Sequence, residues 1–214
     1  MIRAYNELYL EDAMNNLGAM FDYAIYESGF SMMEFYTMFL KSGVAKQFEQ
    51  GNPRYIAGMS GTELAREVVN KCLGDDFLLP PAMVMYDRSP EYWAGWILCY
   101  YQWYTAKPFS RLNDDGLTIE IILKLYPTLH EADISKFVEV ANSIIQNTTA
   151  AMPSRLQTLR KRMGFTQKEL AESSGVSLRC IQLYEQKQQN IATAEVRNVM
   201  NLAKVLRCEI TDIV

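Results

Sequence analysis

The sequence predicts an all-α protein made of two domains with opposite net charge. Apolar residues recur at three- and four-residue spacing through most of the chain, and alternating β-branched stretches are few. The net charge of −4 over 214 residues divides unevenly, because residues 1–150 carry 11 basic and 19 acidic side chains whereas residues 151–214 carry 10 and 6. Aromatic residues divide at the same place, since only Phe165 and Tyr184 follow residue 150. We therefore expect domains at 1–150 and 151–214.

Capping residues mark the expected helices of the first domain. A serine or threonine three residues before a glutamate fits a capping box, in which each side chain accepts a hydrogen bond from the other residue's backbone N–H. Ser89 marks a further start, because proline at the next position suits the first turn of a helix. The capping-box pairs are Ser31 with Glu34, Ser60 with Glu63 and Thr128 with Glu131. The predicted helices span 4–28, 32–41, 61–73, 90–104, 117–126 and 131–146, with an extended segment at 77–87.

The predicted helix at 90–104 is the most aromatic part of the chain and contains all three tryptophans. Helical spacing places four of its rings on one stripe: Trp93, Trp96, Tyr100 and Trp103. Further aromatic residues lie on other faces of this helix. Two interpretations follow: the segment is a central core helix contacted on most sides, or part of its surface is a partner interface or a ligand pocket.

Sequence patterns for catalysis and metal binding are not found. The chain lacks a nucleophile motif, a Walker loop, a G-x-G-x-x-G segment and any metal-ligand spacing. The single histidine, His130, stands at the start of a predicted helix, where we expect a capping role. The acidic pairs at 75–76 and 114–115 adjoin glycines and are expected to be solvated turns. We expect neither an enzyme nor a bound metal or cofactor, and an enzyme with a DNA-targeting domain is the least favoured alternative.

The expected location is the cytoplasm. No run approaches the roughly 20 apolar residues that span a bilayer, and the first residues lack a basic segment followed by an apolar one, so we expect no membrane association. The cysteines lie far apart and show no C-x-x-C spacing, which argues against a zinc site or a disulfide framework. We expect buried thiols at Cys72, Cys99, Cys180 and Cys208.

The expected boundary between the domains lies at about 148–153. Asn147, Thr148 and Thr149 interrupt the apolar periodicity, and Pro153 followed by Ser154 predicts the start of a new helix.

Residues 154–214 contain a spacing that predicts two helices joined by a tight turn. Gln167 opens the first helix, after Thr166 or Phe165, and Ser177 caps the second. Gly175, at the ninth position, supplies the positive φ that such a turn requires. The residues expected to fill the wedge between the helices are Leu170, Val176 and Ile181.

This segment resembles the lambdoid-repressor-like, or Xre-type, helix-turn-helix family. The resemblance includes the flanking stretches LRKRMGFTQKELA and NLAKVLRCEITDIV, and it implies a five-helix lambda-repressor-like DNA-binding domain. In that family an arginine before the turn often pairs with a glutamate at the end of the recognition helix. The matching residues are Arg160 and Glu185, and we expect a structural pair of modest net energy because desolvation opposes the attraction. The recognition helix departs from the family by carrying Leu178, Cys180 and Leu183 where relatives are frequently polar.

The resemblance implies binding to a double-stranded DNA operator. Because a recognition helix reads bases with its first residues, the expected base readers are Ser177, Leu178, Arg179 and Gln182. Arg179 suits the O6 and N7 atoms of guanine, Gln182 suits adenine, and Leu178 suits the methyl group of thymine. Alternatively, Arg179 and Gln182 are ordinary solvated surface. The expected phosphate contacts are Gln167, Lys168 and Lys187.

Partner expectations follow from the two-domain organisation. One such DNA-binding domain contacts few base pairs, so a homodimeric transcriptional repressor on a two-fold symmetric site is the first expectation. The first domain is faintly similar to uncharacterised helical N-terminal regions of bacterial Xre-type regulators, and it is a candidate for dimerisation or sensing. Some Xre-type proteins are antitoxins. The alternative is therefore a protein that binds a toxin through residues 1–150 and regulates its own operator through residues 151–214.

Overall fold

A computed structural model describes residues 3–82 and 87–214 of the chain and divides it into two compact units, Met1–Ile145 and Gln146–Val214. Each unit has its own apolar core. The described residues are mainly helical and include no β-strand, which confirms the all-α prediction. None of the described helices combines the length and the apolarity that a membrane crossing requires.

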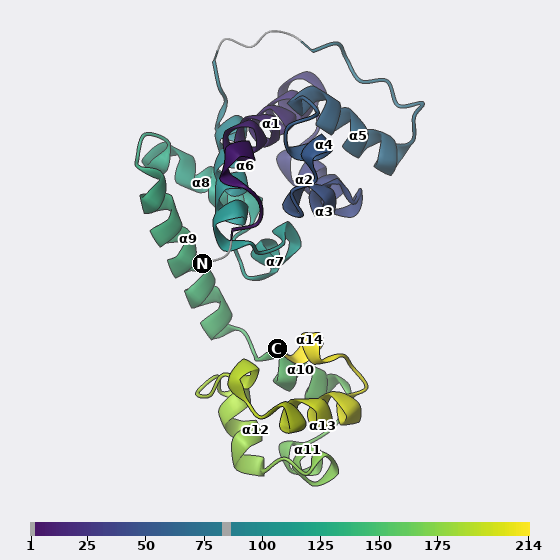
Figure 1. Cartoon of the computed structure of the whole chain (residues 1–214), viewed down its shortest axis with the longest axis vertical. Coiled ribbons are helices and arrows are strands. Elements are labelled where there is room, and N and C mark those ends of the chain that lie inside the picture. Colours follow the sequence, from purple (N-terminus) through teal and green to yellow (C-terminus); the bar gives the residue numbers. More distant parts are fainter. Residues whose placement is uncertain (1–2, 83–86) are drawn as a thin grey trace. The chain divides into compact units, whose positions relative to one another are not determined.

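The N-terminal unit begins with a 3-10 turn, η1 (Glu7–Tyr9), which leads into α1 (Leu10–Asp22) and a π-helical turn, η2 (Tyr23–Glu27). In this unit α1 and α6 (Pro90–Thr105) lie side by side (Figure 1). The further helices are α2 (Met32–Lys41), α3 (Val44–Glu49), α4 (Pro53–Ile56), α5 (Gly61–Leu73), α6 (Pro90–Thr105), α7 (Phe109–Asp114), α8 (Ile119–Leu129) and α9 (Ile134–Ala151).

Three expected helix starts are confirmed. Ser31, Ser60 and Ser89 cap α2, α5 and α6, because each side-chain oxygen accepts the backbone N–H of the third helical residue, at 3.3, 3.3 and 3.0 Å. The full reciprocal capping box forms at α5, where Glu63 Oε2 accepts the Ser60 N–H at 2.8 Å.

The expected start at Thr128 is wrong, because α8 continues past it. Pro127 removes only one backbone N–H, and the His130 N–H still reaches the Tyr126 carbonyl at 3.0 Å. Thr128 instead donates its hydroxyl to the Leu125 carbonyl at 3.0 Å. His130 stacks on Tyr126 with ring centroids 4.5 Å apart. The histidine therefore closes α8 and does not open the next helix.

Helix α9 begins and ends later than predicted. Asp133 caps it by accepting the Ser135 N–H at 2.8 Å. Residues 147–149 do not break the helix, because asparagine and threonine continue a helix that is already formed, at a small cost in propensity. The helix stops at Ala151, two residues before Pro153, as the restriction on the residue preceding a proline favours.

Several short elements lie outside the sequence prediction. Helices α3, α4 and α7 each span six residues or fewer, which is too short to display a helical repeat. In the segment expected to be extended, residues 77–82 form neither helix nor strand, and residues 83–86 lie outside the described residues.

Helices α1 and α6 approach each other closely in the core of the N-terminal unit. A Cβ atom at Gly95 would lie 2.6 Å from the Phe21 ring and 2.7 Å from the Leu17 carbonyl oxygen. A Cβ atom at Gly18 would lie 2.9 Å from the Tyr92 carbonyl oxygen. Both helices therefore need glycine where they cross, and α6 is a central core helix over most of its length.

The four rings predicted on one stripe of α6 differ in burial. Trp93 and Trp103 are 9% and 5% exposed and belong to the core, whereas Trp96 and Tyr100 are half-buried. The stripe is therefore not a single exposed surface, because α6 is covered on most sides.

Two further expectations for side chains are wrong. All four cysteines are free, but only Cys99 is buried: Cys180 and Cys208 are half-buried at the edge of the small C-terminal core, and Cys72 is exposed because it lies in the last turn of α5, outside the core. Asp115 is not a solvated turn residue: it is 5% exposed and pairs with Arg111 Nε at 2.8 Å and Lys107 Nζ at 3.1 Å.

The C-terminal unit packs five α-helices around a small core. Helix α11 contacts α12 and α13, and α10 contacts α12 and α14. The wedge residues Leu170, Val176 and Ile181 are 0%, 2% and 0% exposed, which confirms their expected burial. The elements are α10 (Arg155–Arg162), α11 (Gln167–Ser174), α12 (Leu178–Glu185), η3 (Ile191–Thr193), α13 (Val196–Leu206) and α14 (Ile210–Ile213).

Candidate nucleic-acid interface

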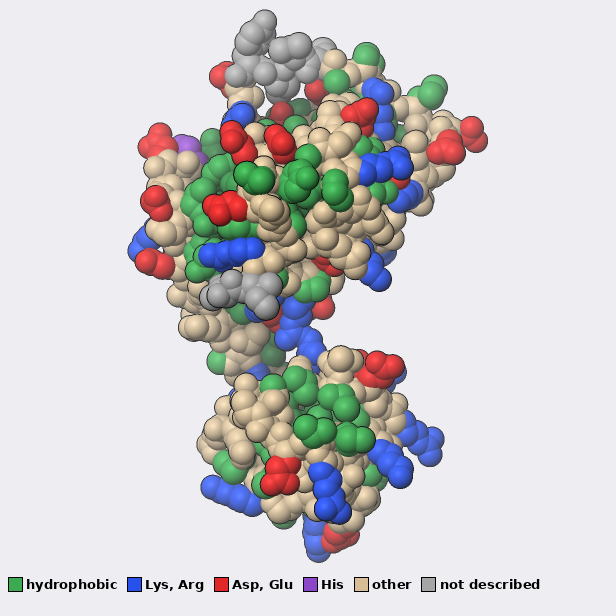
Figure 2. Space-filling model, in the orientation of Figure 1, with side chains coloured by type: hydrophobic (Ala, Val, Ile, Leu, Met, Phe, Trp, Pro, Cys, Tyr) green, Lys and Arg blue, Asp and Glu red, His purple; other side chains and the backbone are tan. Residues whose placement is uncertain are grey.

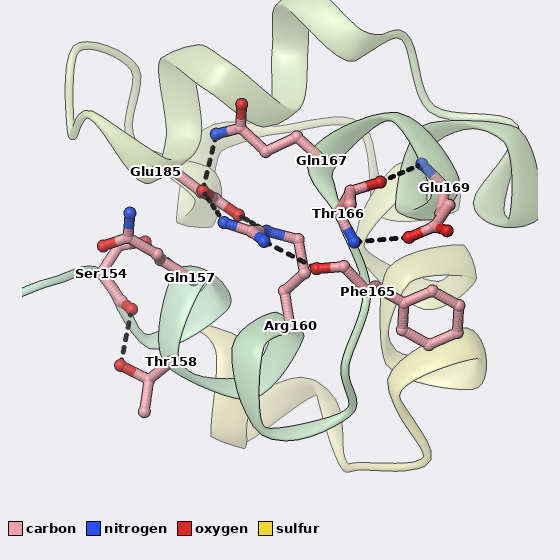
Figure 3. A network of polar contacts seen from close by, with 9 residues as sticks. All are labelled: Ser154, Gln157, Thr158, Arg160, Phe165, Thr166, Gln167, Glu169 and Glu185. Carbon is pink, nitrogen blue, oxygen red and sulfur yellow. Dashed lines mark hydrogen bonds and ion pairs between the residues drawn. The ribbon is translucent and has the colours of Figure 1, made fainter.

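A complete capping box fixes the start of α11. Thr166 Oγ1 accepts the Glu169 N–H at 3.1 Å, and Glu169 Oε2 accepts the Thr166 N–H at 2.7 Å (Figure 3). The hydrogen bond that the Thr166 backbone N–H donates to this carboxylate, and after it the interaction with the Thr166 side chain, lower the pKa of Glu169 below its usual value. Of the two starts left open by the sequence, the structure selects Thr166.

The turn between α11 and α12 depends on Gly175, whose φ is +69°. Its N–H reaches the Ala171 carbonyl at 2.9 Å and closes α11. Two residues later Ser177 caps α12, because its hydroxyl accepts the Cys180 N–H at 3.2 Å. The left-handed glycine and the serine cap together set the direction in which α12 leaves the turn.

A buried ion pair ties α10 to the end of α12. Arg160 Nε lies 2.6 Å from Glu185 Oε1, and Arg160 Nη2 lies 2.9 Å from Glu185 Oε2. The third guanidinium nitrogen, Nη1, donates to the Phe165 carbonyl at 2.7 Å, and Gln167 Nε2 donates to Glu185 Oε2 at 2.8 Å (Figure 3). This network joins α10, the loop before α11, α11 and α12.

The charges of this pair are well compensated. Arg160 and Glu185 are 7% and 6% exposed, and the hydrogen bonds that the guanidinium donates to Glu185 raise the pKa of Arg160 above its usual value. Two parallel N–H···O bonds also fix the relative orientation of the two side chains. Because desolvation offsets much of the attraction, the structural consequence is orientation more than stability.

The first turn of α12 presents its side chains to solvent. Ser177, Leu178 and Arg179 are exposed, with Leu178 at 38%, and Gln182 one turn later is half-buried. Among the residues that the structure describes, no carboxylate lies within ion-pair distance of Arg179. Three of the four predicted base readers therefore lie at the start of α12, with Gln182 one turn further along, and the Arg179 guanidinium is available to an external acceptor.

The predicted phosphate contacts have different surroundings. Lys168 is exposed and lies 3.9 Å from Glu172, a weak surface pair. Gln167 is already bonded to Glu185 through its amide nitrogen. Lys187, at φ +56°, donates its ammonium to the carbonyl oxygens of Thr149 and Met152. No sequence spacing indicates the interaction of Lys187, because its partners lie at the end of α9, far away in the sequence.

A second basic surface lies on α10 and the end of α13. Arg155, Arg162 and Arg207 line a groove of about 650 Å³ together with Asp212. Arg155 Nη1 also donates to the carbonyl of Thr211 at 3.2 Å. Sequence reasoning missed this groove, although the spacing of Arg155 and Arg162 on one face of α10 was a signal that could have indicated it.

An apolar surface is exposed on α13 and α14. Val196, Met200 and Ile210 are 71%, 54% and 43% exposed. Hydrophobic side chains gather over this part of the unit in Figure 2. Exposed apolar groups that lie together on a small domain are typical of an interaction surface.

The buried thiol of the N-terminal unit is held in its neutral form. Cys99 Sγ lies 3.5 Å from Tyr5 Oη, and burial raises the pKa of Cys99 to about 12 and that of Tyr5 far above its usual value. A neutral thiol is a poor nucleophile, so Cys99 has a packing role. In the described ranges, no group of three or more His, Cys, Asp or Glu side chains is placed to hold a metal ion.

Residues 156–213 match a family model described as Helix-turn-helix, and this range includes nearly all of α10 to α14. The match confirms that the C-terminal residues are an Xre or lambda-repressor-like helix-turn-helix domain, and it supports a DNA-binding regulator of the Xre type. The comparisons with curated proteins and with solved structures found no match.

Proposed function

We propose that this chain, whose C-terminal unit is an Xre-type helix-turn-helix domain, is a sequence-specific bacterial transcriptional regulator that represses as a homodimer. The observation that carries the proposal is the exposed first turn of α12, with Arg179 at its centre. The far end of the same helix is held by Arg160 and Gln167. A recognition helix needs both features, a solvent-facing start and a fixed axis.

Base readout follows from the side chains at this turn. In the major groove the Arg179 guanidinium donates to O6 and N7 of a guanine, a contact that discriminates by about 1–3 kcal/mol. Gln182 pairs with an adenine, Leu178 packs on a thymine methyl group, and Ser177 donates or accepts beside them. Of the residues that replace polar ones in this helix, Leu178 is the exposed one, so its apolar contact with thymine would distinguish this operator.

Phosphate contacts position α12 in the groove. Lys168 and Gln167 stand at the start of α11, where backbone N–H groups also face an anion. Lys187 reaches phosphate only by exchanging the carbonyl oxygens of Thr149 and Met152 for phosphate oxygens. Its contribution is therefore smaller than that of a lysine without an internal partner.

A second copy supplies the second half-site. One unit of this size contacts few base pairs, and two copies on a two-fold site multiply the number of contacts. The exposed apolar residues Val196, Met200 and Ile210 support self-association through α13 and α14, outside the proposed base-reading turn.

A mobility-shift titration tests the proposal. The full chain is titrated with the DNA immediately upstream of its own gene and with a shuffled duplex of the same length and composition, at two salt concentrations. We expect the upstream DNA to bind at least about 1,000-fold more tightly than the shuffled duplex, with both affinities falling as salt rises. Equal affinity for both duplexes would contradict sequence-specific regulation.

A second candidate function is that of an antitoxin. It is favoured by the apolar and aromatic surface of the acidic N-terminal unit, where Leu8 is 87% exposed and Tyr9 is 40% exposed. In this reading the N-terminal unit binds a toxin and the C-terminal unit regulates the shared operator. Co-expression with each neighbouring gene tests it, because a stable complex that forms with residues 1–150 is expected, and absence of any such complex would remove this candidate.

A further inference from the structure

The half-buried rings of α6 lie on the wall of a cavity. Trp96 and Tyr100 are separated by one helical turn and therefore project from the same face. They line a cavity of about 510 Å³ between α6 and the start of α1, with Leu10 and Met14 on the opposite side. This volume lies within the range of sites that hold a small ligand or a single protein side chain.

Two carboxylates line the same cavity. Glu7 and Glu11 are exposed and one turn apart, so that two like charges share one face. No described cation lies within ion-pair distance of either residue, and the N-terminal unit as a whole carries a net charge of −8. Two unpaired carboxylates beside aromatic rings attract a cation that also has apolar atoms to bury.

The rings of α6 already bind guanidinium groups elsewhere on the helix. The Arg3 guanidinium lies 4.0 Å from the centre of the Tyr104 ring and 4.8 Å from that of Trp103. Arg88, the one cation among the described residues lining the cavity, lies 4.5 Å from the centre of the Tyr92 ring. Trp96 is left without such a cation in the described structure.

From this arrangement we infer that the cavity between α1 and α6 binds an arginine or lysine side chain of a partner protein. The charged end of that side chain lies between the carboxylates of Glu7 and Glu11, and its alkyl stem packs on Trp96 and Tyr100. The exposed Leu8 beside Glu7 provides apolar contact for the partner around the bound side chain.

The inference rests on the candidate function in which the N-terminal unit binds a partner, and it specifies the chemistry of that partner. A basic side chain in an acidic, aromatic cavity complements the charge of the unit. An acidic partner would be repelled by the same residues.

Nuclear magnetic resonance of the indole N–H signals tests the site on the full chain. The probe is N-acetyl-arginine-N-methylamide, and the matched control is N-acetyl-citrulline-N-methylamide, which has the same shape without the charge. Trp96→Phe assigns the Trp96 signal. We expect the arginine probe to shift the Trp96 signal and to leave those of Trp93 and Trp103 in place, and the citrulline probe to bind about tenfold more weakly.

Two double variants separate the site from general charge attraction. Glu7→Gln/Glu11→Gln is expected to weaken the arginine probe about fivefold to tenfold, whereas Asp75→Asn/Asp76→Asn, which removes the same charge from an exposed loop, is expected to leave it unchanged. Equal binding of the two probes, equal losses in the two variants, or no shift at Trp96 would each overturn the inference.

The mobility-shift titration keeps this outcome separate from that of the proposed function. Glu7→Gln/Glu11→Gln is expected to bind the upstream DNA as the unchanged chain does, because α12 belongs to the other unit. Loss of probe binding with retained operator binding supports the site. Failure of the unchanged chain to bind its operator would count against the regulator and not against the cavity.

Discussion

The two units of this protein hold their helices together in different ways. The N-terminal unit of 145 residues packs an aromatic core around α1 and α6, and the helices touch where both have glycine. The C-terminal unit of 69 residues has a much smaller apolar core and places the Arg160–Glu185 pair among its helices. A small unit buries a smaller share of its surface, so polar bonds with fixed geometry take over the task of orienting its helices.

The largest expected effect is a loss of stability confined to the C-terminal unit. Glu185→Ala leaves the Arg160 charge buried without a partner and should destabilise the C-terminal unit by about 3–5 kcal/mol. Chemical denaturation followed by far-UV circular dichroism measures this loss. Tryptophan fluorescence provides the control, because all three tryptophans belong to the N-terminal unit and their transition should not move. Lys136→Ala, which breaks an exposed pair with Glu139, should cost less than about 1 kcal/mol.

If Glu185→Ala and Lys136→Ala reduced the free energy of unfolding by similar amounts, the buried pair would contribute no more than an exposed one. The contrast between the two units would then not hold.

The next largest loss of stability is expected in the N-terminal unit, where α1 and α6 are in close contact. Gly95→Ala places a methyl group 2.6 Å from the Phe21 ring, and overpacking of this kind costs about 1–3 kcal/mol. The tryptophan fluorescence transition should shift to lower denaturant concentration. An unchanged fluorescence transition would mean that the glycine contact is not what limits the packing of this unit.

DNA binding sharpens the comparison within the C-terminal unit. Arg179→Ala should weaken operator binding by about 1–3 kcal/mol and hardly change binding to shuffled DNA. Lys187→Ala should weaken both about equally and lower the salt slope by less than about 1, because its ammonium is bonded to two carbonyl oxygens in the free protein. Arg197→Ala, an exposed arginine of α13 outside the proposed base-reading turn, is the matched control for charge. Equal effects of Arg179→Ala on both duplexes would remove Arg179 as a base reader.

The turn between α11 and α12 predicts the smallest effect. Gly175→Val forces a β-branched residue to φ +69°, which costs about 1–2 kcal/mol, although no described atom beyond the two chain neighbours lies within 4 Å of the added Cβ. Gly175→Asn should lose less, because asparagine tolerates this conformation. Thermal unfolding of the full chain measures both variants. If valine and asparagine gave the same melting temperature as glycine, the positive φ would not be required for stability.

The two units also differ in how well the sequence predicts them. The spacing of Gln167, Gly175 and Ser177 predicts the turn and both of its helices, because steric requirements at these positions leave few alternatives. In the N-terminal unit, caps at Ser60 and Ser89 predict long helices, but α8 passes through Pro127 where a local rule would end it. The continuation of α8 through Pro127 depends on how the helix packs against the rest of the unit. That packing is not evident from a single sequence.

Site residues show the same division between local and tertiary information. The exposure of Arg179 follows from helical periodicity, because it lies on the side of α12 away from the buried Ile181. The partner of Lys187, in contrast, is the end of a helix that lies 35 to 38 residues earlier in the chain. The pairing of Glu7 and Glu11 with the rings of α6 was likewise not predicted, because the two segments are brought together only by the crossing of α1 and α6.

The network around Glu185 has a thermodynamic consequence for the proposed association of α12 with DNA. Arg160 and Gln167 already restrict the rotamers of Glu185 and the tilt of α12 in the free protein. Little further freedom is then lost when the helix enters a groove, so the entropy cost of binding falls mainly on the side chains of its first turn. The free energy gained from each base contact is therefore retained more fully as affinity than it would be on a helix that had to be ordered first.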